Sequence, residues 1–128
     1  MRLELTRKTD LALRAFRFLA ASEGRASSRT LAEAVGTTVP FIAQVMAPLV
    51  RAGLATSRPG PGGGYAPGGD PRAVSVLAII EAVEGPVDPG KCVLVGGPCG
   101  APPCSLHDAW LSARSALEDA LRGAPALG

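Results

Sequence analysis

The fold is decided by residues 27–65, which read SSRTLAEAVGTTVPFIAQVMAPLVRAGLATSRPGPGGGY. The two serines at the start cap a short helix over residues 29–35, which Gly36 ends. A threonine then caps a second helix, over residues 38–52. Two helices joined by a short glycine-containing turn form a helix-turn-helix, and the second helix of that motif enters the major groove of DNA.

The second helix has one apolar face and one outward face. The side chains expected to point inward are Val39, Ile42, Val45, Met46, Leu49 and Val50. Those expected to point outward are Pro40, Ala43, Gln44, Ala47 and Arg51. Pro48 lies inside the helix, where it should remove a backbone hydrogen bond and kink the helix.

A glycine-rich turn over residues 58–65 follows a short predicted strand, residues 54–57. Glycine supplies the backbone conformations that tight turns need. A flexible linker has the same composition. The position directly after the second helix favours a wing, that is, two strands joined by a tight turn.

Three further helices are expected around this unit. The first covers residues 6–22 and carries Arg7, Asp10, Arg14 and Arg17 on its polar side, as a solvated face or as phosphate contacts. Another runs from a Ser75 cap to about residue 84. The segment 85–103 has no periodicity.

The last helix opens on an approximate capping box, Ser105 to Asp108. Its apolar stripe consists of Leu106, Trp110, Ala113, Leu117 and Leu121. This stripe is a candidate dimer interface, and docking on the core of the same chain is compatible with that role. The predicted fold is mainly α with a small β wing: a winged helix-turn-helix over residues 1–84, a cysteine-bearing loop over 85–104, and a dimerisation helix and tail over 105–128, in one compact domain.

Composition and charge fit a DNA-binding protein. The 128 residues contain no apolar run near the ~20 residues of a membrane span and no signal-peptide pattern, so we expect a cytoplasmic protein without a membrane partner. Residues 1–58 include nine basic and four acidic residues, and residues 59–128 include four basic and seven acidic ones. A basic half joined to a mildly acidic half is typical of a DNA-binding module followed by a sensing or oligomerising element.

Cys92, Cys99 and Cys104 lie within thirteen residues. In a reducing compartment, such clustering indicates a metal site before it indicates disulfides. With His107 three residues further on, the set suits zinc as well as an iron–sulfur cluster on chemistry alone.

Three motifs carry a resemblance to a known family: the run from Gly60 to Tyr65, the run from Cys104 to Trp110, and the early run from Thr9 to Arg14. On these the chain resembles the IscR/NsrR type of winged-helix regulators, which use an iron–sulfur cluster to sense cluster status, nitric oxide or redox state. The resemblance covers nearly the whole chain. It implies a homodimer that binds a double-stranded DNA operator through the helix-turn-helix and the wing.

The DNA-binding residues expected from the motif and the resemblance are Arg7, Arg29, Thr37, Thr38, Gln44, Arg51, Arg58, Gly62, Gly63 and Tyr65. Gln44 matches a base-reading position of the IscR branch. Ala43 replaces the adjacent glutamate of that branch, and the arginine before the wing glycines is displaced by one position, to Arg58. These departures leave the operator sequence open.

The resemblance implies that Cys92, Cys99 and Cys104 hold the cluster. His107 resembles the fourth ligand of a 2Fe–2S site in the IscR branch. Asp10 resembles an NsrR-branch aspartate that completes a 4Fe–4S site from the partner subunit. We favour 2Fe–2S, and such a cluster can be lost on isolation. The cysteine spacing of six and four residues departs from the family's usual five and five.

Two other functions stay open: a cluster-independent regulator of the same fold with a thiol switch, and a small metal or redox protein that does not bind DNA. We do not expect an enzyme, because the chain lacks a credible Ser/His/Asp set and the Lys-Ser/Thr of a phosphate-binding loop.

Overall fold

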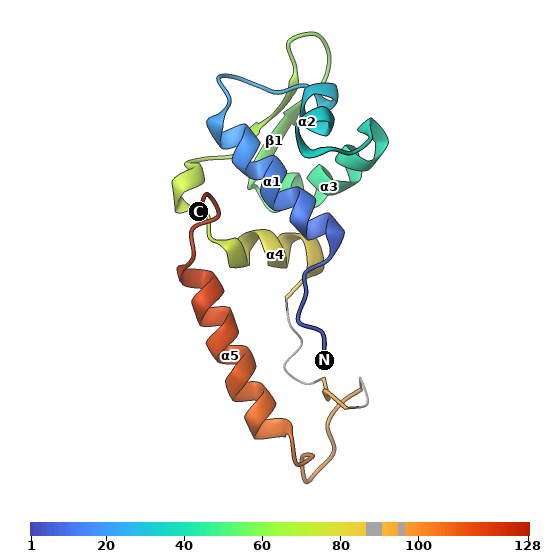
Figure 1. Ribbon diagram of the computed structural model, residues 1–128, viewed down its shortest axis with the longest axis vertical. Helices are drawn as coiled ribbons and strands as arrows, with labels where there is room; N and C mark the ends of the chain where they lie inside the picture. The colour runs from blue at the N-terminus through green and yellow to red at the C-terminus, as the bar shows by residue number, and fades with distance from the viewer. Residues whose placement is uncertain (87–90, 95–96) are drawn as a thin grey trace.

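The computed structural model describes residues 1–86, 91–94 and 97–128 (Figure 1). The elements are α1 (Arg7–Ala21), α2 (Ser28–Val35), α3 (Val39–Arg51), β1 (Ala55–Arg58), β2 (Gly64–Pro67), a 3-10 turn (Pro71–Ala73), α4 (Val76–Glu84) and α5 (His107–Gly123). This is the expected mainly α fold with a two-stranded antiparallel sheet. The predicted loop 85–103 lies partly outside the described residues.

Side-chain caps fix the starts of four helices. The hydroxyl oxygens of Thr6, Ser27, Thr38 and Ser75 each accept a hydrogen bond from the backbone amide three residues later. Such a bond satisfies an amide that has no partner within the helix. The predicted capping box at Ser105 is wrong: α5 begins two residues later, and its cap position is Leu106, which makes no side-chain cap bond.

The helix-turn-helix is confirmed. Gly36 ends α2 in the left-handed region, with φ of 76°. The axes of α2 and α3 are bent by 97° relative to each other, which is the angle expected of the motif. Within the described residues no single helix is long and apolar enough to span a membrane; only this bent pair passes that test, taken together.

The core is built from the apolar faces of α1, α2 and α3, with α4 beneath them (Figure 1). Ile42, Val45, Met46 and Leu49 of α3 are fully buried, as expected, and Pro48 is buried without ending the helix. The predicted inward orientation of Val39 is wrong. Its side chain is 45% exposed, because it occupies the first residue of α3, before the helix reaches the core.

The wing is confirmed as an antiparallel hairpin in which Ala55 pairs with Pro67 and Arg58 with Gly64. Its second strand also pairs with the segment before α2: Ala26 and Tyr65 exchange backbone hydrogen bonds of 2.9 and 2.8 Å. This pairing requires glycine at position 64, where a Cβ would lie 2.2 Å from the Ala26 carbonyl oxygen and φ is 113°.

α5 extends away from the other helices, and only its C-terminal end comes near α4 (Figure 1). Within the described chain, no residue of α5 is buried. The tail that follows returns to the core, where Ala126 is fully buried and its amide donates to the Val74 carbonyl oxygen at 2.8 Å. The helix is therefore anchored at its end, and most of its length is left uncovered.

Candidate DNA-binding surface and metal centre

The outward face of α3 carries Gln44 and Arg51, both exposed. At the start of the helix, Thr38 is exposed and Thr37 is half-buried, and the Thr38 hydroxyl oxygen accepts the amide of Phe41 at 3.2 Å. These are the positions from which a recognition helix contacts base edges and phosphates.

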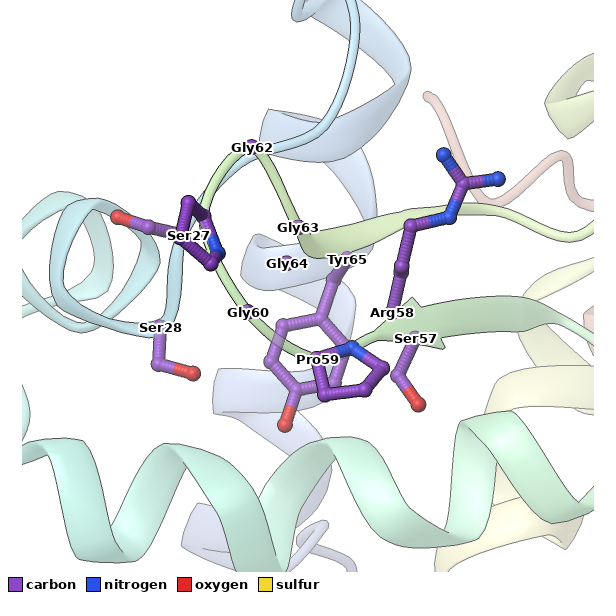
Figure 2. Close-up of a pocket in the computed structure, with 11 residues that line it drawn as sticks. Ser27, Ser28, Ser57, Arg58, Pro59, Gly60, Gly62, Gly63, Gly64 and Tyr65 are labelled. Atoms are coloured by element: carbon purple, nitrogen blue, oxygen red, sulfur yellow. The ribbon is translucent and has the colours of Figure 1, made fainter.

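The wing turn and the start of α2 enclose an open hollow (Figure 2). Its lining includes the predicted DNA contacts Arg58, Gly62, Gly63 and Tyr65. In this view the hydroxyls of Ser28, Ser57 and Tyr65 point to the side of the turn that faces a helix, and the Arg58 guanidinium points the other way (Figure 2). The turn thus offers polar groups on two sides.

Arg25 is a functional candidate that sequence reasoning missed. Its guanidinium donates to the carbonyl oxygens of Gly64 at 3.1 Å and Thr56 at 3.4 Å, and to the Thr56 hydroxyl at 3.1 Å. It therefore bonds to both strands of the wing. No local pattern reveals this role, because the strand partners lie 31 and 39 residues further along the chain.

The remaining basic candidates lie on α1 and α2. Arg7 is exposed in the first turn of α1, and Arg29 is exposed on α2, 3.9 Å from the Glu33 carboxylate. An exposed ion pair of this kind contributes little energy and leaves Arg29 available to a phosphate. Arg17 has an internal role, because its Nε donates to the Ala126 carbonyl oxygen at 2.7 Å.

The three cysteines come together. Their sulfur atoms all lie within 4.8 Å of one another, and those of Cys92 and Cys104 are 3.8 Å apart, well beyond the ~2.05 Å of a disulfide. The Cys104 amide donates to the Cys99 sulfur at 3.1 Å. Cys92 is buried, and the other two are half-buried. The geometry offers three soft donors to one metal centre.

The pKa of the Cys104 thiol is raised above its ordinary value. The largest influence, a hydrogen bond with the Leu106 backbone, lowers the pKa, but desolvation and the adjacent Cys99 and Cys92 together outweigh it. A metal ion that binds the Cys104 sulfur must therefore displace the proton of that thiol.

The structure places the two predicted fourth ligands differently. His107, in the first turn of α5, lines the recess that holds the three cysteines, but it is outside the group of donor atoms that lie within 4.8 Å of one another. Lys91 and Arg114 line the same recess and add positive charge. Asp10 is on α1, exposed, with its carboxylate 3.4 Å from Arg14.

The family model for Rrf2, described as an iron-dependent transcriptional regulator, matches residues 5–124. The chain belongs to the Rrf2 family. The HTH-type transcriptional regulator IscR of Vibrio cholerae is 36% identical over 91 residues, which are 71% of this chain and 53% of the relative. IscR of Escherichia coli is 34% identical over 93 residues, 73% of this chain and 55% of the relative. The chain thus spans about half the length of the curated relatives it matches.

Solved structures of Rrf2-type regulators have the same fold. CymR, described as the global cysteine regulator of B. subtilis, superposes with a TM-score of 0.77 at 27% identity, covering 98% of this chain and 94% of that one. IscR of T. potens gives a TM-score of 0.73 at 26% identity, covering 97% of this chain and 83% of that one. The expected winged helix-turn-helix and the resemblance to IscR-type regulators are confirmed.

Proposed function

We propose that this Rrf2-family chain is a homodimeric transcription regulator whose affinity for its DNA operator depends on an iron–sulfur cluster held by Cys92, Cys99 and Cys104. The observation that carries the proposal is the convergence of three cysteine sulfurs within 4.8 Å at the start of α5. A bacterial regulator of chromosomal genes works in the cytoplasm, which is the location we assign. We propose no catalytic activity.

The residues present fit such a cluster. Three thiols on one centre are soft ligands of the type that iron–sulfur clusters take, and among the described residues that line the recess His107 is the further one with a metal-ligand side chain. Lys91 adds a positive charge to the recess that favours an anionic group, whereas the charge of Arg114 is shared with the Glu118 carboxylate 3.9 Å away. When bound, the cluster would supply reversible electron transfer and reactivity towards oxidants or nitric oxide. We favour 2Fe–2S, with Asp10 of a second subunit as the alternative fourth ligand in a 4Fe–4S site.

The exposed apolar side chains of α5 support the homodimer. Leu106, Trp110 and Leu117 lie on one side of the helix, and Ala113 between them is exposed as well. Leu121 is half-buried near the end that meets α4, so it borders both the partner and its own chain. A second copy of the same face would cover these side chains symmetrically.

DNA binding follows from α3 and the wing. In this proposal the exposed Gln44 reads a base edge, and the exposed side chains of Arg7, Arg29, Arg51 and Arg58 contact phosphates. Because the cysteines and the DNA-binding elements belong to one chain, occupancy of the metal site can shift the population of DNA-competent dimers, provided that the cluster binds the two states differently.

The first test is the metal content of protein purified without oxygen. We expect charge-transfer bands with matched iron and sulfide in the wild type, and loss of most of both in Cys99→Ser. Ser105→Ala is the matched control, since Ser105 is exposed beside Cys104. A zinc-loaded, colourless protein would instead make the site structural. A metal-free protein that resists reconstitution, and in which added hydrogen peroxide oxidises Cys92 and Cys104 to a disulfide while being reduced to water, would make it a thiol switch.

The second test is DNA binding by selection from random duplexes. We expect enrichment of a palindromic site, and Gln44→Ala should relax preference at one base pair of each half-site, at a cost of ~1–3 kcal/mol. Ala47→Ser, on the same helix, serves as the control. Binding without any enriched sequence, or no salt-dependent binding to duplex DNA, would contradict the proposed regulator.

A further inference from the structure

Glu84, the last residue of α4, reaches across to the start of α1. Its Oε2 accepts from the Thr6 amide at 3.4 Å, from the Thr6 hydroxyl at 3.5 Å and from the Thr9 hydroxyl. The donors are 75 and 78 residues away in sequence. Thr9 is fully buried, and its hydroxyl also lies 3.0 Å from the Thr6 hydroxyl, so the two hydroxyls and the Glu84 carboxylate form one hydrogen-bonded group.

The arrangement is a capping box completed by another helix. In the usual motif, a glutamate at the third helical position accepts the amide of the cap residue. Here Thr6 is the cap residue and Thr9 holds the third position, so α1 itself has no carboxylate at that position. Glu84 supplies it from α4, and its negative charge also suits the positive end of the α1 dipole.

This contact joins the two parts of the protein that the proposed function connects. α1 packs against α2 and α3, the two helices of the DNA-binding motif. Glu84 directly precedes the segment that leads to Cys92, and Asp10 lies in the first turn of α1. A shift of the cysteine segment that moves Glu84 must therefore break bonds to α1 or carry α1 with it.

We propose that Glu84 is a positioning residue that couples the metal site to the DNA-binding helices, by holding the first turn of α1 against the start of the cysteine segment. The coupling role in this inference rests on the proposed function. Its structural part, the contact across α1 and α4, does not require a bound cluster.

The test compares Glu84→Ala with Glu81→Ala. Glu81 lies on the same helix and is exposed, and its carboxylate has no hydrogen bond or ion pair among the described residues. The metal-free proteins are first examined by amide hydrogen exchange. We expect exchange at Thr9 and Asp10 to accelerate at least about 5-fold in Glu84→Ala and to be unchanged in Glu81→Ala. Glu84→Gln, which keeps an acceptor oxygen, should restore part of the protection.

The second readout is the ratio of DNA affinities between the cluster-loaded and cluster-free forms. A typical coupling between two sites is ~5–150-fold, and Glu84→Ala should reduce the wild-type ratio at least about 3-fold while iron content stays unchanged. Thr9→Val, which removes the hydroxyl donor at similar volume, should reduce it in the same direction.

The outcomes separate the two hypotheses. Unchanged exchange at Thr9 and Asp10 in Glu84→Ala would overturn the contact, and an unchanged affinity ratio in a variant with faster exchange would overturn its coupling role. If the wild type bound DNA equally with and without cluster, the proposed function and the coupling role would both fail, and the exchange data alone would decide whether the contact exists.

Discussion

The segment from α1 to α4 and the helix α5 differ in how much of their surface is buried within the chain. The first segment buries its apolar side chains in a shared core, and its helices are capped by their own residues. α5 makes no side-chain cap and, within the described chain, buries none of its residues. The difference indicates that the segment from α1 to α4 packs within a single chain, whereas α5 is left uncovered, and the proposed homodimer would cover it.

The largest effect is expected from a charge in the middle of the exposed stripe of α5. Leu117→Asp should weaken the dimer at least ~100-fold, because an unpaired carboxylate buried at an interface costs ~3–5 kcal/mol. Sedimentation over a concentration series measures the effect. Ser115→Asp, about 200° around the helix, is the control. A Leu117→Asp protein that stays as dimeric as the control would show that α5 is not the interface.

The next effect concerns the wing and should leave the dimer intact. A Cβ at Gly64 would lie 2.2 Å from the Ala26 carbonyl oxygen, so Gly64→Ala should lower the free energy of unfolding by ~2 kcal/mol. Urea denaturation of the dimeric protein measures this. Gly69→Ala is matched, because a Cβ there would meet no described atom within 4 Å. Equal stability of the two variants would contradict the close strand pairing.

The smallest effect separates two arginines of the wing. Arg25→Gln should weaken DNA binding a few-fold without changing the slope of log K against log salt, because Arg25 binds the wing strands. Arg58→Gln should weaken binding by a similar factor and reduce that slope by about 1, as expected of a phosphate contact. A reduced slope for Arg25→Gln would make Arg25 a phosphate contact as well.

The sequence predicted the DNA-binding half well because its signals are local. Ser27 and Thr38 each cap the helix that starts at the next residue, by accepting the amide three residues later. Gly36 ends a helix in the left-handed region, and the wing glycines lie directly between two strands. Each feature depends on neighbours within a few residues, so pattern and position suffice.

The features that sequence reasoning missed depend on distant partners. In the sequence Arg25 is one of many basic residues, and its bonds to the wing strands become apparent only in the folded chain. Glu84 likewise has no sequence feature that distinguishes it from any other last residue of a helix. The same limit applies to the metal centre. Cysteine clustering predicted the three sulfurs that converge, but the fourth ligand of the proposed cluster, His107 or Asp10, depends on how α5 and a second subunit would be arranged.

The most direct test measures operator affinity on one anaerobic sample before and after removal of its cluster, with Cys99→Ser treated in parallel. We predict at least a ~5-fold change in affinity for the wild type and none for Cys99→Ser, which starts without the cluster. Equal wild-type affinities in the two states, with iron and sulfide shown to be bound and then lost, would contradict cluster-dependent regulation.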